Sequence, residues 1–190
     1  MFAAPINDDL KLILLQEHHA TALFAAVDRN RDHLGAWLPW VAGTKTATDT
    51  LDFIKGRKKD FVEKGEFACA IVKNGDIAGV IGLHDLNRHK RNVVIGYWLA
   101  ENYTGQGIMT KAVSRILDYI FNDLALNHAA IHVDVENGKS SAIPRRFGFI
   151  HEGTLRDANR IGDRFQNMDV FGIRAEEWFT YKSTGKDKEK

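Results

Sequence analysis

The chain has 190 residues, 44% of them hydrophobic, which suits one domain with a sizeable core. Its formal net charge of +1 gives no broad positive surface for DNA or RNA, and its 1 cysteine excludes an intrachain disulfide or a cysteine-cluster metal site. With neither the features of a signal peptide nor a run of about 20 apolar residues, we expect a cytoplasmic protein with no nucleic-acid or membrane partner.

The first half of the chain alternates between strand and helix patterns. An apolar run predicts a strand at residues 10–15, and apolar residues at helical spacing predict a helix near residues 20–27. Pro39 ends any helix in the tryptophan-rich segment that follows, and a Thr-rich start predicts another helix from Thr46. Asn74-Gly75 predicts a tight hairpin, because this dipeptide favours the turn that joins two twisted strands.

The hairpin strands are expected at residues 66–72 and 77–84, and a polar loop at 85–91 leads to a strand at 93–99. Apolar residues from Met109 to Leu124 form one helical stripe. After a strand at 129–135, Ser140 is expected to cap a short helix at 141–147, and two strands follow at 154–161 and 165–174. This order predicts a mixed α+β sheet in one domain, residues 1–181, with a charged, disordered tail at 182–190.

Two glycines flank Gln106 at the point where the strand at 93–99 gives way to a helix. Gly105 and Gly107 let backbone N–H groups point at one spot, with the positive end of the helix dipole behind them, which favours a phosphate group. The spacing excludes a nucleotide P-loop and a dinucleotide fingerprint, because Thr110 stands where the latter needs glycine. By itself, the turn is better explained as a plain strand-to-helix connection.

Further motifs accompany the turn, in a fixed order. Together they resemble the GNAT superfamily of acetyl-coenzyme A-dependent N-acetyltransferases, and most closely its RimJ/RimL-type branch, which acetylates protein N-termini. The segments that carry the resemblance are Asn30-Arg31-x-His33-Leu34-x-x-Trp37-Leu38-Pro39-Trp40, Gly96-Tyr97-Trp98-Leu99, Gly105-Gln106-Gly107, Glu136-Asn137-x-x-Ser140 and Gly148-Phe149-x-x-Glu152-Gly153-x-Leu155-Arg156.

The resemblance implies a mostly antiparallel sheet of about seven strands, flanked by helices, whose central strands splay apart to admit acetyl-coenzyme A. Backbone N–H groups of the glycine turn would hold the pyrophosphate, the end of the preceding strand would pair with the pantetheine arm, and no metal is required. The cofactor-binding residues implied are Trp98, Leu99, Ala100, Thr104, Gly105, Gln106, Gly107, Ile108, Met109, Thr110, Asn137 and Ser140.

Two positions depart from the usual superfamily pattern. Thr104 stands where Gln or Arg is common, and Pro144 stands where many members place a tyrosine that protonates the departing thiolate. In the RimL-like branch Ser140 is the usual substitute. Because a serine hydroxyl is a poor acid near neutral pH, Ser140 is expected to donate a hydrogen bond to the thiolate or to relay a proton through water.

The general base has several candidates. His84 and Asp85 end a strand beside the predicted cofactor strand, and Glu101 borders the glycine turn. Glu152 is a further carboxylate, whereas Asn159 replaces a glutamate proposed as the base in RimL-type relatives and cannot serve. The catalytic residues predicted are Ser140, Glu101 and His84. Each carboxylate or histidine also has an ordinary structural reading, and deprotonation through water without a dedicated base stays open.

The acceptor is expected to be the N-terminal α-amine of a protein, including ribosomal proteins, because weak bases deprotonate it more easily than lysine. Trp37, Trp40 and His84 are the expected acceptor-binding residues, with core packing as the alternative for the tryptophans. A small amine such as a polyamine, amino sugar or drug is the alternative acceptor, and a non-catalytic acyl-coenzyme A sensor is the alternative function. The resemblance also implies a homodimer or higher homo-oligomer.

Overall fold

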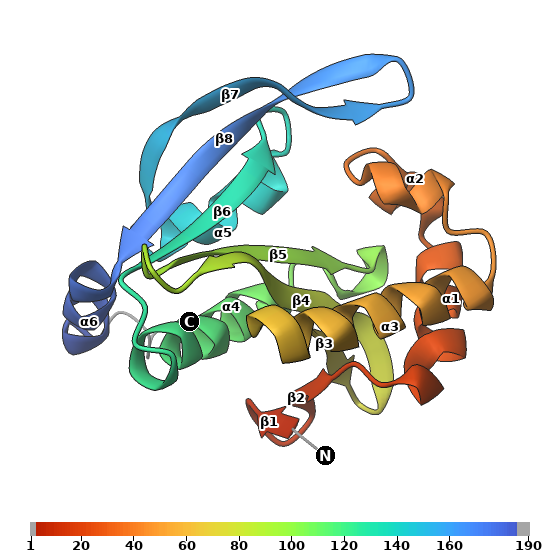
Figure 1. The fold of residues 1–190 in the computed structure, drawn as a ribbon, viewed down its shortest axis with the longest axis horizontal. Helices are drawn as coiled ribbons and strands as arrows, with labels where there is room; N and C mark the ends of the chain where they lie inside the picture. The colour runs from red at the N-terminus through yellow and green to blue at the C-terminus, as the bar shows by residue number, and fades with distance from the viewer. Residues whose placement is uncertain (1–2, 186–190) are drawn as a thin grey trace. The chain divides into compact units, whose positions relative to one another are not determined.

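The computed structural model describes residues 3–185, and these form an eight-stranded mixed sheet with helices α1 to α6 (Figure 1). The strand order is β1-β2-β3-β4-β5-β6-β8-β7. β5 and β6 pair in parallel, whereas the β1–β2, β2–β3, β3–β4, β6–β8 and β7–β8 pairs are antiparallel. The predicted α+β class is therefore confirmed.

Two compact units make up this part of the chain. The first unit consists of residues 3–84 and 96–112, and the second of residues 85–95 and 113–185. The elements of the first unit are β1 (Ala3–Pro5), β2 (Leu10–Leu14), α1 (Ala20–Asp28), α2 (Arg31–Gly35), α3 (Ala47–Lys64), β3 (Phe67–Lys73), most of β4 (Asp76–Asn87) and the end of β5 (Asn92–Leu99).

Helices α1 and α3 pack on the strands of the first unit. Leu23 of α1 and Ile54 of α3 are buried in one cluster with Ala70 of β3 and Val80 of β4, so their apolar stripes face the sheet. The predicted hairpin is confirmed, since Lys73 pairs with Asp76 around Asn74-Gly75. Both turn residues have positive φ, 51° and 92°, as a tight hairpin between twisted strands requires.

The second unit contains the remaining elements. They are the start of β5, the end of α4 (Ile108–Asp118), a π-helical turn (Tyr119–Asp123), β6 (His128–Asp134), α5 (Gly138–Arg146), β7 (Ile150–Ile161), β8 (Arg164–Arg174) and α6 (Ala175–Ser183). The long, curved β7–β8 hairpin is evident in Figure 1. Trp178 of α6 is fully buried, stacks on Tyr181 and donates from its indole Nε1 to Asp118 Oδ1 at 3.1 Å.

Several element boundaries differ from those expected. The eighth strand is β1, whose three residues include Pro5 and are too short for a periodic pattern, yet they pair with β2. Helix α6 was not predicted, because Trp178 is its one buried residue and leaves no apolar stripe. It takes in Lys182 and Ser183 of the predicted tail, whereas residues 186–190 lie outside the described residues.

The helix after the glycine turn and the strand before it also differ in extent. The apolar stripe predicted one helix as far as Leu124, but α-helical geometry ends at Asp118 and a wider π turn carries the stripe onward. Strand β4 continues to Asn87, three residues into the expected loop. No helix among residues 3–185 is long and apolar enough to cross a membrane.

The parallel ladder between β5 and β6 is short. It joins Asn92–Val94 to His128–Ala130, near the first residues of both strands. Strand β5 nevertheless continues to Leu99. The carboxyl end of β5, which leads to the glycine turn, therefore extends beyond this ladder.

Candidate active site

The glycine turn adopts the backbone conformation that its composition predicts. Gly105 and Gly107 have φ values of 74° and 71°, a region that disfavours side chains. A Cβ added at either glycine would meet no heavy atom within 4 Å. Backbone conformation, and not crowding by the protein, therefore calls for glycine here, and the space beside both residues is open.

Helix α4 begins directly after this turn. Lys111 donates its backbone N–H to the Gly107 carbonyl at 3.0 Å, which is the first i to i−4 bond of the helix. The N–H groups of the preceding turn consequently make no intrahelical bond, and the positive end of the helix dipole lies among them. This arrangement is suited to an anion such as a pyrophosphate.

Two polar side chains of the turn bond back to the protein. The Thr104 hydroxyl donates to the Glu101 carbonyl at 2.7 Å, and Gln106 Nε2 donates to the Asn102 carbonyl at 2.8 Å. A hydroxyl has one proton to donate, and the one on Thr104 is used within the loop. An anion at this turn would therefore be held mainly by main-chain N–H groups, as the departure at Thr104 predicts.

The end of β5 does not present all its backbone groups to one edge. Ala100 donates its N–H to the Ala78 carbonyl of β4 at 2.8 Å, and a Cβ on Gly79 would lie 2.2 Å from the Trp98 carbonyl oxygen. Trp98 and Ala100 thus face β4, and strand alternation turns Leu99 to the opposite edge. Pairing of this strand end with the pantetheine arm stays a prediction, and Leu99 is the residue of the three whose backbone groups face away from β4.

His84 lies against the same strand. A Cβ added at Gly96 of β5 would come within 3.1 Å of His84 Nε2, so this glycine leaves room for the imidazole ring over the strand. Glu101 begins the 3-10 turn η3 (Glu101–Tyr103), and its side chain is exposed. Of the predicted catalytic residues of the first unit, His84 is therefore packed against β5 and Glu101 faces solvent.

The predicted acceptor tryptophans precede helix α3. Trp40 belongs to the 3-10 turn η2 (Pro39–Ala42), is 42% exposed, and its ring centroid lies 6.3 Å from that of Trp98. Trp37 is half-buried. Trp40 is therefore not a buried core residue, and its role in binding the acceptor stays a prediction.

Asn137 and Ser140 meet at the start of α5. Asn137 is the N-cap of this helix, and its Oδ1 accepts the Ser140 N–H at 3.0 Å. The prediction that Ser140 caps a helix over residues 141–147 is wrong: the helix begins at Gly138, because the asparagine amide precedes Ser140 and satisfies its N–H. Ser140 therefore lies, half-buried, in the first turn.

The candidate base Glu152 and the residue Asn159, which replaces a base of RimL-type relatives, both have defined structural partners. Glu152 Oε1 lies 2.8 Å from His128 Nε2, and Asn159 Nδ2 donates to Gln166 Oε1 at 2.9 Å.

Burial raises the pKa of the Cys69 thiol to about 12, which agrees with a core role for this residue. Within residues 3–185, no group of three or more His, Cys, Asp or Glu side chains is arranged to hold a metal ion.

Sequence reasoning missed two residues that contact the end of β5. His33 Nε2 lies 3.2 Å from the Leu99 carbonyl oxygen, and Asn30 Oδ1 accepts the Glu101 N–H at 2.9 Å. Both residues belong to the Asn30-Arg31-x-His33-Leu34 segment that carries part of the family resemblance. That segment was the available signal, but only its tryptophans were given a role.

Comparison with known proteins identifies the family to which this chain belongs. The acetyltransferase (GNAT) domain matches residues 9–150. YdaF of Bacillus subtilis (strain 168) is 31% identical over 180 residues, covering 94% of this chain and 98% of YdaF. The ribosomal-protein-serine acetyltransferase of Escherichia coli (strain K12) is 25% identical over 87% of this chain and 93% of its own length.

One similar protein has been solved together with a cofactor. The microcin C7 self-immunity acetyltransferase MccE, in complex with acetyl-CoA and AMP, superposes with a TM-score of 0.84 at 25% identity, covering 89% of this chain and 94% of that chain. The open glycine turn at a helix start is consistent with such a cofactor. The chain therefore belongs to the GNAT acetyltransferase family, and it is an acetyl-coenzyme A-dependent N-acetyltransferase.

Proposed function

We propose that the acceptor is the N-terminal α-amine of a protein, with ribosomal proteins the first substrates to test, and that transfer is direct, in the cytoplasm. The observation that carries this proposal is the similarity to the Escherichia coli ribosomal-protein-serine acetyltransferase along 87% of this chain. The exposed ring of Trp40 beside Trp98 adds support, because it offers a flat apolar surface to an extended peptide.

Amine chemistry favours the same acceptor. An α-amine has a pKa of roughly 7.7–8.0, whereas lysine has about 10.4, so freeing lysine of its proton costs about 3.5 kcal/mol more. His84, packed against β5, and the exposed Glu101 carboxylate are the candidates for this task, acting directly or through water. A weak base suffices for an α-amine, and a thiol pKa near 8.5 makes the thiolate a good leaving group.

We assign residues to three parts of acetyl-coenzyme A: the pyrophosphate, the pantetheine arm and the sulfur that leaves as a thiolate. Main-chain N–H groups of residues 105–110 would hold the pyrophosphate, since the Thr104 N–H already donates to the Glu101 carbonyl. Leu99 on the outer edge of β5 would pair with the pantetheine arm. Asn137 would offer it Nδ2, since Oδ1 already accepts the Ser140 N–H. Ser140 would stabilise the departing thiolate, because Pro144 is buried within α5 and has no proton to donate. Acetyl-coenzyme A supplies the activated acyl group.

The test uses purified protein, acetyl-coenzyme A and peptides that match ribosomal-protein N-termini. Each peptide is compared with an otherwise identical peptide whose α-amine is blocked but whose lysines are intact, and spermidine is assayed in parallel. Thiol release and a mass gain of one acetyl group are expected only with the open α-amine. Turnover of spermidine alone would replace the protein acceptor by a small amine, and cofactor binding without any turnover would favour an acyl-coenzyme A sensor.

A further inference from the structure

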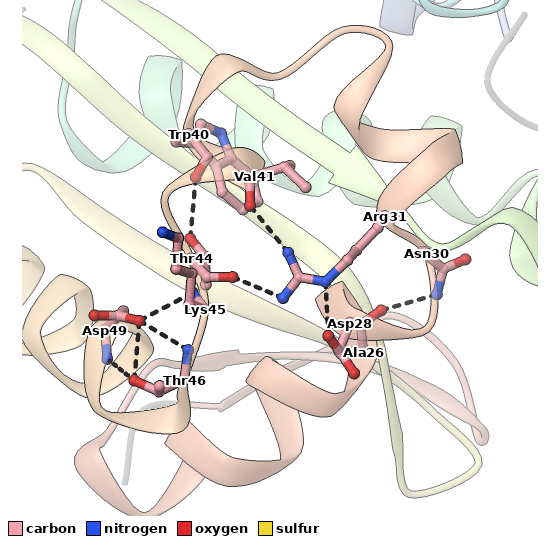
Figure 2. Close-up of polar contacts among 10 residues, drawn as sticks. All are labelled: Ala26, Asp28, Asn30, Arg31, Trp40, Val41, Thr44, Lys45, Thr46 and Asp49. Atoms are coloured by element: carbon pink, nitrogen blue, oxygen red, sulfur yellow. Dashed lines mark hydrogen bonds and ion pairs between the residues drawn. The ribbon is translucent and has the colours of Figure 1, made fainter.

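Polar contacts converge where α1 meets α2, and we call Asn30, Arg31 and His33 the helix corner. Figure 2 shows Asn30 and Arg31 of this corner together with the loop that leads to α3. All of these residues belong to the first unit, as do Trp40, the end of β5 and the glycine turn. The corner therefore lies between segments to which sequence reasoning assigned the acceptor and the cofactor.

Asn30 uses both ends of its amide. Its Nδ2 donates to the Ala26 carbonyl near the end of α1 at 2.8 Å (Figure 2), and its Oδ1 accepts the Glu101 N–H at 2.9 Å. Glu101 is the first residue after β5 and Ala100, at the entrance to the glycine turn. A neutral amide supplies a donor and an acceptor at once, whereas an ionised carboxylate only accepts.

His33 makes a second contact, with Leu99, which precedes Glu101 by two residues and is the last residue of β5. Its Nε2 lies 3.2 Å from the Leu99 carbonyl oxygen, and because a carbonyl only accepts, Nε2 must carry the proton. The Leu99 carbonyl is on the edge of β5 that faces away from β4. His33 thus restrains the strand edge on which the pantetheine arm is placed.

Arg31 connects the corner to the loop after the tryptophans. Its guanidinium donates to the carbonyls of Val41 at 3.2 Å and Thr44 at 2.8 Å, and its Nε pairs with Asp28 at 2.7 Å (Figure 2). Both carbonyls follow Trp40 closely in the chain. One planar side chain therefore holds the acceptor segment against the end of α1.

We propose that the helix corner is a positioning device with two separable arms. Asn30 and His33 hold the end of β5 and the entrance to the glycine turn in the conformation that binds coenzyme A, whereas Arg31 holds the segment that bears Trp40. These are positioning residues, because they act through backbone groups and not on the reacting atoms. The proposal rests on the placement of the cofactor given above and adds the residues that maintain it.

The experiment measures coenzyme A affinity by calorimetry, the KM values for acetyl-coenzyme A and acceptor peptide, and the Tm of the unliganded protein. Asn30→Leu removes both amide contacts, Asn30→Asp keeps the acceptor for the Glu101 N–H, and His33→Phe keeps a flat ring without the donor. Arg31→Met tests the other arm. Asp49→Ala is the matched control, because it breaks a capping network in the same region, with bonds to Lys45 and Thr46.

Asn30→Leu and His33→Phe are expected to weaken coenzyme A binding about tenfold, which corresponds to the loss of one good hydrogen bond. Asn30→Asp should restore most of this affinity even if its Tm is lowered. Arg31→Met should raise the KM for peptide while coenzyme A affinity stays the same. Asp49→Ala should lower Tm and leave both binding parameters unchanged.

Equal affinities for wild type, Asn30→Leu and His33→Phe would overturn the proposal, as would losses that merely follow Tm across all variants. If Asn30→Leu does not yield folded protein, His33→Phe carries the decision. The cofactor placement is tested separately by Gly107→Ala, with Gly75→Ala as control, because φ is positive at both and neither Cβ meets an atom within 4 Å. Unchanged affinity in Gly107→Ala would reject the placement, whereas a loss there together with normal Asn30 variants would reject only the corner.

Discussion

At the scale of single residues, the site is built from side chains that satisfy backbone groups. Asn137 shows this clearly, because its Oδ1 caps α5 while its Nδ2 has no partner among the described residues. The same residue therefore has a structural half and a half that is available to a ligand. A substitution can therefore remove the Nδ2 donor while it keeps the oxygen that caps α5.

Asn137→Asp keeps the capping oxygen and removes the amide donor. We predict an unchanged or slightly higher Tm, since a carboxylate is favourable at a helix N-terminus, and a KM for acetyl-coenzyme A raised about tenfold. Asn137→Ala should raise KM similarly and also cost about 1 kcal/mol of stability through loss of the cap. Steady-state kinetics and thermal unfolding measure both effects. A normal KM in Asn137→Asp would mean that Nδ2 makes no cofactor contact.

At the scale of elements, close approach between strands explains some glycines better than turns do. A Cβ on Gly82 of β4 would lie 2.3 Å from the Phe67 carbonyl oxygen of β3, a backbone atom that cannot move away alone. A Cβ on Gly172 of β8 would meet the Glu152 carboxylate at a similar 2.3 Å. That group is the far end of a flexible side chain and can move.

Gly82→Ala is therefore expected to destabilise the protein by about 3 kcal/mol, because β3 and β4 must separate to admit the methyl group. Gly172→Ala should cost less than about 1 kcal/mol, the value of a half-exposed ion pair such as the one between Glu152 and His128. Chemical denaturation of both variants provides the comparison. Equal losses would show that side-chain relaxation at Gly172 is as restricted as the backbone at Gly82.

The secondary-structure elements also show which parts of the fold can be predicted from sequence patterns. The Asn74-Gly75 hairpin was predicted because its turn chemistry is local, and α3 because its stripe and Thr46 cap are periodic and local. Helix α6 was missed because its stability comes from burying Trp178 against residues distant in sequence, including Asp118. The π turn at residues 119–123 keeps the apolar stripe and so leaves no sequence signal.

At the scale of the whole molecule, the described residues form two compact units, and the glycine turn belongs to the first of them. A ligand that binds the folded protein and not the unfolded chain stabilises the folded state by RT ln(1 + L/Kd), where L is the concentration of free ligand. Acetyl-coenzyme A held at the glycine turn should therefore raise the free energy of unfolding of the protein.

Acetyl-coenzyme A at 100 times its Kd contributes about 2.7 kcal/mol of stability. For a chain of this size, that corresponds to a Tm increase of roughly 5–11 °C. Differential scanning calorimetry with and without cofactor measures it, and Gly107→Ala at the same concentration is the control, with a smaller shift expected. An unchanged Tm in the presence of the cofactor would contradict binding to the folded protein, and an equal shift in Gly107→Ala would contradict a contact with the glycine turn.

The sequence by itself determined the family, the position of the glycine turn and the order of most strands and helices, because turn chemistry, periodicity and ordered motifs are written in short stretches of residues. Only the tertiary structure decided which edge of β5 each backbone group faces, and that Asn30 and His33, some 70 residues earlier in the chain, hold its end. The physical reason is that strand pairing and side chain-to-backbone bonds depend on neighbours brought together by folding, which no local pattern records.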